Sequence, residues 1–318
     1  MSGTFARYAA AVLAFTVGVI LWGAFVRISG SGAGCGNHWP LCNGVVVPLA
    51  PTITTLIEFT HRMMSGLDGI AIGVLVVWAF RVFPRRHPVR LGAVLTAIFL
   101  ATEVLVGAAL VKLEHVARNA SVGRAYSLSG HLINTLTLLA CLTLTIWWAS
   151  GGARLTLRGS AAWLAIPGLA LFVILAISGA IAALGDTLFP ARSLAEGIRQ
   201  DLEPAASIFV RLRLFHPLLA VGTAAWLGFY AAMQRHKAGW LGWSLLGLVM
   251  LEIAAGGLNL WLLAPWWMQM VHLLLADLAW IALVLVCASA LQQPPVPADQ
   301  RANEMASGVR RLQRLGQT

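Results

Sequence analysis

The chain has 318 residues, of which 59% are hydrophobic and 11% are charged. A soluble domain rarely exceeds about half apolar residues, so this composition excludes an ordinary soluble protein. The formal net charge of +10 would suit a nucleic-acid binder, but the basic residues gather in short loops between apolar segments. That distribution is typical of membrane orientation, and we expect no nucleic-acid partner.

Eight apolar segments reach the roughly 18 residues that a membrane-spanning helix needs. They cover about residues 9–27, 55–80, 91–112, 129–149, 161–184, 209–232, 241–263 and 267–290. Arg7 precedes the first segment, but no small-residue cleavage site follows it. We therefore interpret this segment as a retained helix, not a signal peptide. The sequence predicts an all-α integral membrane protein with eight transmembrane helices surrounded by membrane lipid.

Basic residues mark one side of the predicted membrane. They fill the loops after the second, fourth and sixth segments and the C-terminal tail, with few acids among them: Arg81, Arg85, Arg86, Arg90, Arg154, Arg158, Arg235, Lys237, Arg301, Arg310, Arg311 and Arg314. Cytoplasmic loops carry such an excess of Lys and Arg. We expect a multi-pass protein of the cell inner (cytoplasmic) membrane with both termini cytoplasmic.

The segments divide into two halves that look like copies. VILWGA at 19–24 is echoed by VIL at 173–175 and SGA at 178–180, and an acid followed four residues later by glycine occurs in each half, at Glu103 and Glu252. Copies with an even number of helices share one orientation. We predict two pseudo-symmetric four-helix bundles, residues 1–150 and 151–290, followed by a disordered cytoplasmic tail, 291–318.

Four histidines, two in each half, lie near the outer ends of four different segments: His61, His131, His216 and His272. Ionisable residues inside a membrane are costly and are functional candidates by default. Facing helices of a bundle can supply two imidazoles to one haem iron. Each histidine could instead pack against a neighbouring helix, but four at repeat-related positions favour two ligand pairs. A zinc site would bring Cys or carboxylate ligands at close spacing, which three of the four lack.

A carboxylate accompanies the first of these histidines. Glu58 lies one turn before His61 in the stretch EFTHR at 58–62, so both share a helix face. There it could serve as a base, a proton relay or a charge stabiliser. Alternatively, it pairs with Arg62 four residues on. Arg213 occupies the corresponding place in the second half, so we expect the halves to differ in role.

Two further features lie on the outer side. Cys35 and Cys42 bracket a short Gly- and Pro-containing stretch of the first outer loop. An oxidising compartment favours a disulfide there, either as a structural staple or as a redox pair. Arg27 and Arg62, near outer helix ends, could bind the propionates of a haem or contact lipid headgroups.

Several stretches together resemble the bacterial and mitochondrial haem A synthases over about residues 9–290. They are VRISGSGAGC at 26–35, WPLCNG at 39–44, EFTHR at 58–62 with the other three helix histidines, and GAIAALGDTLFP at 179–190. The resemblance implies oxidation of the C8 methyl group of haem O, through an alcohol, to the formyl group of haem A, which terminal oxidases use. It also implies a haem O synthase (prenyltransferase) and cytochrome oxidase assembly as partners, while the electron acceptor stays unknown.

The resemblance also assigns roles to residues. His216 and His272 would ligate the iron of a haem B cofactor in the second half, and His61 and His131 would hold the substrate haem iron in the first. Glu58 would lie beside the reacting edge of that substrate, and Cys35–Cys42 would form a disulfide. Glu103 and Glu252 replace what are mostly amide or apolar residues in the family, and the resemblance assigns them no role.

Two other classes of protein compete with this interpretation. A dihaem cytochrome that only carries electrons would favour histidine pairs near opposite faces of the membrane, whereas all four histidines here lie near one face. A transporter built from repeats would show broken helices and polar residues near the midplane, and these segments are mostly uninterrupted. The sequence therefore favours the haem-modifying enzyme.

Overall fold

The computed structural model describes residues 2–292 except 118, 158–159 and 205. Its helices are α1 (Ser2–Ile28), η1 (Ser31–Ala33), α2 (Ile53–Val82), α3 (Pro88–Lys112), α4 (Val122–Ala149), α5 (Ser160–Leu188), α6 (Leu194–Leu202), α7 (Ile208–Arg213), α8 (Phe215–Ala238), α9 (Trp240–Trp261) and α10 (Trp266–Leu291). Within the described residues, eight spans are long and apolar enough to cross a membrane, with α7 and α8 together forming the sixth. The predicted all-α membrane fold is confirmed.

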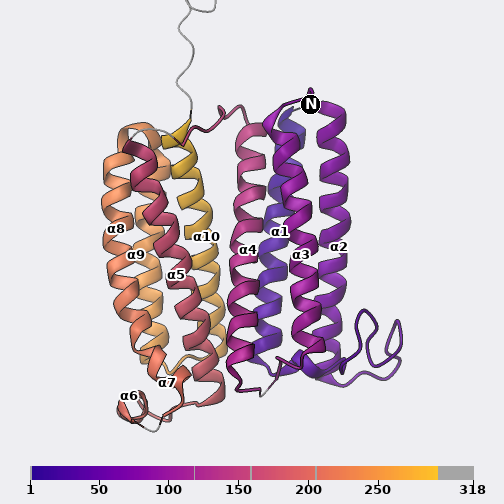
Figure 1. The fold of residues 1–318 in the computed structure, drawn as a ribbon, viewed down its shortest axis with the longest axis vertical. Coiled ribbons are helices and arrows are strands. Elements are labelled where there is room, and N and C mark those ends of the chain that lie inside the picture. The colour runs from indigo at the N-terminus through magenta and orange to yellow at the C-terminus, as the bar shows by residue number, and fades with distance from the viewer. Residues whose placement is uncertain (1, 118, 158–159, 205, 293–318) are drawn as a thin grey trace, which may run out of the picture.

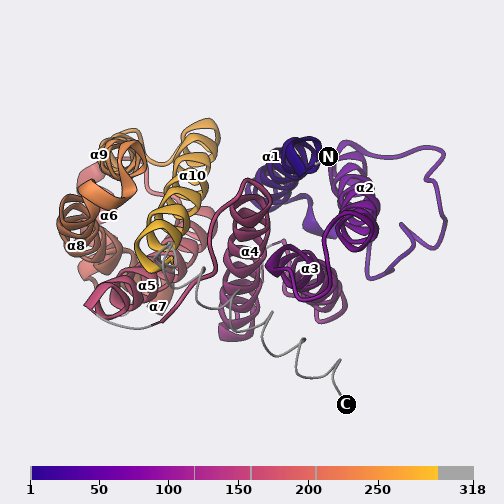
Figure 2. The ribbon, with the colours of Figure 1, turned by 90° about the horizontal axis from the view of Figure 1, so that it is seen from above.

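The spans form two bundles that stand side by side (Figure 1). Helices α1 to α4 form the first, and α5, α8, α9 and α10 form the second, with α4 and α10 adjacent at the junction when the molecule is seen from above (Figure 2). Residue Ser2 and the last turn of α10 lie at one end of the bundles, which we call the terminal end. The long loop after α1 and helices α6 and α7 lie at the opposite end, which we call the histidine end.

The predicted sixth span, about residues 209–232, is confirmed as Ile208–Ala238, although it consists of two helices where one continuous helix was expected. The chain forms α7, breaks at Leu214 and begins α8 at Phe215. Pro217 explains the interruption, because it has no N–H to donate to the Arg213 carbonyl. His216 therefore lies in the first turn of a new helix.

The predicted start of the fourth helix at residue 129 is wrong. Helix α4 begins at Val122, where Ser121 caps it by accepting a hydrogen bond from the Arg124 backbone N–H at 3.2 Å. The first turns of this helix are more polar than its interior, so hydropathy placed the boundary too late. His131 lies well inside α4 and not in its first turn. A short helix, α6, lies in the segment between α5 and α7.

Both bundles are packed most tightly at the terminal end. In the first bundle the buried cluster consists of residues in the terminal halves of α1 to α4: Phe5, Ala9, Val12, Ile72, Leu75, Ala79, Phe83, Val89, Ala93, Leu142 and Ala149. A second cluster fills the terminal half of the other bundle and reaches across the junction to Leu136 and Leu139. This leaves the histidine ends of both bundles with fewer large buried side chains.

Polar contacts join the two bundles at the junction. Trp280 in α10 donates its indole N–H to the Leu136 carbonyl of α4 at 2.7 Å. The backbone N–H of Thr156 donates to the Leu291 carbonyl at 2.8 Å, tying the link between the halves to the end of α10. The expected tail begins at 291, and its residues 293–318 lie outside the described part of the chain.

Candidate functional site

The four histidine rings occupy repeat-related settings, each against a glycine of a neighbouring helix. A Cβ added at Gly23 in α1 would lie 2.9 Å from Cε1 of His61, and one added at Gly179 in α5 would lie 3.0 Å from Cε1 of His216. The same holds for Gly107 with His131, at 3.9 Å, and for Gly256 with His272, at 3.1 Å. In each bundle, two glycines thus allow two imidazoles to lie close to the neighbouring backbone.

The second-half pair has the separation that one metal ion requires. The ring centroids of His216 and His272 lie 6.4 Å apart, with planes at 75°. Two imidazoles that bind one ion from opposite sides, through nitrogens at about 2 Å, would have their centroids about 6 Å apart. Within the described residues no three His, Cys, Asp or Glu side chains cluster closely enough to hold a metal ion by themselves. This donor set fits a haem, whose macrocycle supplies the other four ligands.

The Ser178 hydroxyl contacts one histidine of the second-half pair. The hydroxyl donates to the Leu175 carbonyl at 2.7 Å, so the oxygen is left to accept from Nδ1–H of His216 at 2.9 Å. The proton is then on Nδ1, and Nε2 keeps the lone pair that a metal ion binds. Sequence reasoning missed this serine, although it precedes Gly179 in the stretch that repeats residues 19–24.

Two acids contact the other histidine of each pair. Glu103 Oε1 lies 3.1 Å from His131 Nδ1, and Glu252 Oε1 lies 3.2 Å from His272 Nδ1. Neither contact has the alignment of a full hydrogen bond. The side chains of His131 and His272 are 28% and 25% exposed although they lie among helices. Like Nδ1 of those two rings, His61 Nδ1 is buried and has no hydrogen-bond partner among the described residues, and it also lacks a carboxylate contact. The rings therefore border space at the histidine end.

Glu58 is buried, with 4% of its surface exposed, and both of its oxygens are engaged. Oε1 pairs with Arg62 at 2.5 Å, and Oε2 accepts the backbone N–H of Cys35 at 2.8 Å. The same Arg62 also donates to the carbonyls of His38 and Leu41, each at 2.7 Å. Glu58 and Arg62 thus connect the first outer loop to α2, close to His61. The Glu58–Arg62 ion pair, the alternative that the sequence left open, is present.

The predicted disulfide is present. Cys35 and Cys42 are bonded, and both are buried within the first outer loop. The Thr55 hydroxyl donates to the Gly34 carbonyl at 2.7 Å, and Lys112 in α3 donates to the Asn37 carbonyl at 3.0 Å. The loop is therefore tied to both α2 and α3 above the first histidine pair.

The corresponding place in the second half is built differently. Arg213 in α7 pairs with Asp186 at 3.0 Å and with Asp201 at 2.6 Å, joining α5, α6 and α7. The other candidate arginine, Arg27, donates to the Thr187 hydroxyl at 3.5 Å and so contacts the other half of the molecule. The two halves therefore differ in structure as well as in sequence at this place. Glu58 contacts the loop after α1, whereas Arg213 joins α7 to α5 and α6.

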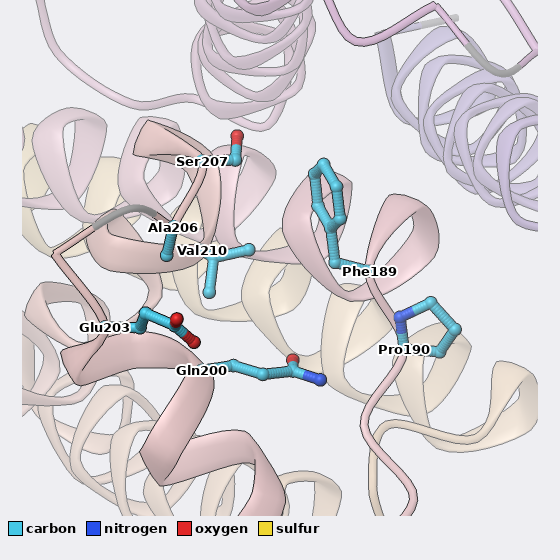
Figure 3. Close-up of a pocket in the computed structure, with 7 residues that line it drawn as sticks. All are labelled: Phe189, Pro190, Gln200, Glu203, Ala206, Ser207 and Val210. Atoms are coloured by element: carbon cyan, nitrogen blue, oxygen red, sulfur yellow. The ribbon is translucent and has the colours of Figure 1, made fainter.

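A cavity of about 340 Å³ lies beside these outer helices (Figure 3). Its lining residues come from the segment just after α5, from the end of α6 and the loop that follows it, and from the start of α7: Phe189, Pro190, Gln200, Glu203, Ala206, Ser207 and Val210. None of the four helix histidines lines it. It is a feature of the outer surface of the second half, separate from the histidine pairs.

The fold and the site define a class of protein: a multi-pass membrane protein built from tandem four-helix bundles, each with a pair of histidines at the same end. The family described as cytochrome oxidase assembly protein, COX15-CtaA, matches residues 6–284. The chain belongs to this family.

Curated relatives fall into two groups. "Protoheme IX farnesyltransferase" from each of two strains of Thermus thermophilus is 47% identical over 299 residues, which is 91% of this chain and 48% of the relative. The chain thus spans about half the length of these relatives. "Heme A synthase" from Geobacillus kaustophilus is 44% identical over 93 residues, 29% of this chain and 29% of the relative. The Exiguobacterium sp. protein of the same name is 39% identical over 93 residues, 29% of this chain and 31% of the relative.

Proposed function

We propose that the protein is a haem A synthase, a membrane oxidoreductase that converts the C8 methyl group of haem O to a formyl group. The observation that carries this proposal is the recurrence of one histidine pair in each bundle, with a 6.4 Å separation in the second. The shared family and the "Heme A synthase" relatives support it. One pair serves a resident cofactor and the other serves the substrate.

His216 and His272 are the residues that would hold haem B in the second half. A bound haem B supplies one-electron redox chemistry beside the substrate site. The chain's contribution there is to orient both imidazoles, through Ser178 on one side and Glu252 on the other. The packed terminal half of the bundle would keep this site toward the histidine end.

His61 and His131 would hold the substrate haem O in the first half. This bundle lies in an apolar membrane environment, so the farnesyl tail of haem O would enter with no polar groups to desolvate. Arg27 and Arg62 are candidate partners for the propionates. Since Arg62 already donates to two loop carbonyls and to Glu58, a propionate there would share this guanidinium with the loop.

Glu58 is the proposed catalytic carboxylate beside the reacting methyl group. It is buried and lies one turn from His61. As a base it would take a proton from the substrate carbon or from the alcohol oxygen as the carbon is oxidised. Its charge-assisted contacts to Arg62 and Cys35 hold it in place, so the outer loop would set its position.

The proposal includes a location and partners. Basic loops at the terminal end support an inner-membrane protein with cytoplasmic termini, which puts both histidine pairs toward the outer face. The substrate is the product of a haem O synthase (prenyltransferase), which makes that enzyme a natural partner. The Thermus relatives named "Protoheme IX farnesyltransferase" are about twice as long as the part that matches this chain, and they support such an association. The product would go to cytochrome oxidase assembly.

Pigment extraction tests the activity. The chain is produced in a host that supplies haem O, and the haems of its membranes are extracted and separated. The proposal expects haem A in these membranes and none in membranes that carry the His61→Ala variant. An electron-carrying dihaem cytochrome, the alternative, would show a reduced-minus-oxidised haem spectrum but leave haem O unchanged.

A further inference from the structure

The two acids beside His131 and His272 stand in equivalent places of the two halves. Glu103 lies in α3 and Glu252 in α9, each four residues before the glycine that faces the histidine of the next span. Their oxygens lie 3.1 and 3.2 Å from Nδ1 of the respective rings. Among the described residues the other histidine of each pair forms no ion pair with an acid: His216 instead contacts the Ser178 hydroxyl, and His61 has no ion-pair partner.

A carboxylate beside Nδ1 of an imidazole determines how the ring binds metal. It keeps the proton on Nδ1, leaves Nε2 free for the iron and makes the ligand more basic. A ferric haem carries one more positive charge than a ferrous haem, so a nearby negative charge in a medium of low dielectric favours the ferric state. Both effects lower the reduction potential of the haem.

We propose that Glu103 and Glu252 are positioning residues that orient His131 and His272 through Nδ1 and lower the reduction potential of the haem that each ring binds. This inference rests on the proposed function for the presence of the haems. Each haem would then be held by one imidazole that contacts a carboxylate and by one that does not.

The two acids differ in their other contacts. Asn134 donates to Glu103 Oε2 at 2.6 Å, and the Thr135 hydroxyl donates to Oε1. Glu103 therefore shares its negative charge with two donors from α4. Glu252 Oε2 is buried and has no hydrogen-bond partner among the described residues. More of the charge of Glu252 is left to act on its histidine, so we expect the stronger effect at the haem B site.

The test is a redox titration of haem B in the purified, haem-loaded protein. Glu252→Gln keeps the size of the side chain but removes its charge. We expect haem B to stay bound to two imidazoles, with the ratio of ferrous to ferric haem rising about tenfold at a fixed ambient potential, equivalent to about 59 mV for one electron. Ser178→Ala alters the opposite ligand of the same haem through a neutral contact, and it should shift the ratio less.

Glu103→Gln is the matched control, because it makes the same substitution in the other half. It should leave the haem B titration unchanged. An unchanged titration in Glu252→Gln, or an equal shift in Glu103→Gln, would overturn the inference. If Glu252→Gln loses its haem, Glu252→Asp decides: recovery of haem with a potential near that of the unaltered protein supports a carboxylate role, and failure to recover contradicts it. Absence of haem from the unaltered protein would instead refute the proposed function.

Discussion

Glu58 is hydrogen-bonded to the loop that contains the disulfide, because the backbone N–H of Cys35 donates to its Oε2 at 2.8 Å. The carboxylate therefore holds the loop, and in the proposed function it also acts on the substrate. Glu58→Gln retains an oxygen that can accept from Cys35 but loses the charge. We expect haem to remain bound while haem A production falls by about 10²–10⁴-fold, the range for a lost acid–base group, as measured by extraction of pigments.

A loop variant separates these two duties. Cys35→Ser combined with Cys42→Ser removes the disulfide and leaves Glu58 and Arg62 in place. Its loss of haem A production should be smaller than that of Glu58→Gln. Normal turnover in Glu58→Gln would remove the catalytic assignment, and an equal loss in both variants would reduce Glu58 to a loop anchor.

The glycines beside the histidines should be intolerant of a methyl group. Gly179→Ala would put a Cβ 3.0 Å from His216 Cε1, so the ring must shift away from its present position. Such overpacking costs about 1–3 kcal/mol. We expect haem B content per chain to fall in Gly179→Ala, and substrate binding in the first half to fall in Gly23→Ala.

Gly18→Ala is the control for the first half, because it lies in α1 like Gly23 but has open space around its added methyl group. Alanine is the better helix former by about 0.5–1 kcal/mol. Thermal stability should therefore hold or rise in this variant, and haem content should not change. Loss of haem in Gly18→Ala equal to that in Gly23→Ala would argue against a steric effect on His61.

Replacing one of the proposed haem-binding histidines should remove the haem from that half of the protein only. His216→Ala or His272→Ala is expected to lose haem B, measured as a pyridine haemochrome per chain, because one imidazole of the pair is gone. His236→Ala offers a control, since that ring is exposed near the end of α8. Retention of a full complement of haem B in both ligand variants would exclude this pair as its binding site.

Reduction of the Cys35–Cys42 disulfide should impair activity more than structure. The loop is also held by Glu58, Arg62, Thr55 and Lys112, so the helices should survive without the bond. We expect an unchanged far-ultraviolet circular dichroism spectrum and a measurable loss of haem A production after mild reduction. Unchanged production would leave the bond without a role in activity.

The sequence predicted the membrane fold well because long apolar runs leave helices as the only way to satisfy the backbone in lipid. It failed where local chemistry sets a boundary: Pro217 breaks the sixth span, and the Ser121 cap extends α4 into polar residues. The repeat of histidines was visible in the sequence. The contacts of Ser178, Glu103 and Glu252 were not, because partners on separate helices depend on how the helices are rotated in the bundle.

The spectrum of the purified ferric protein, measured together with haem B per chain, tests most directly whether a histidine pair binds one iron between two imidazoles. We expect about one haem B per chain, with the low-spin signature of two imidazole ligands. A protein that carries no haem B, or haem B in a high-spin state with a single imidazole, would contradict it.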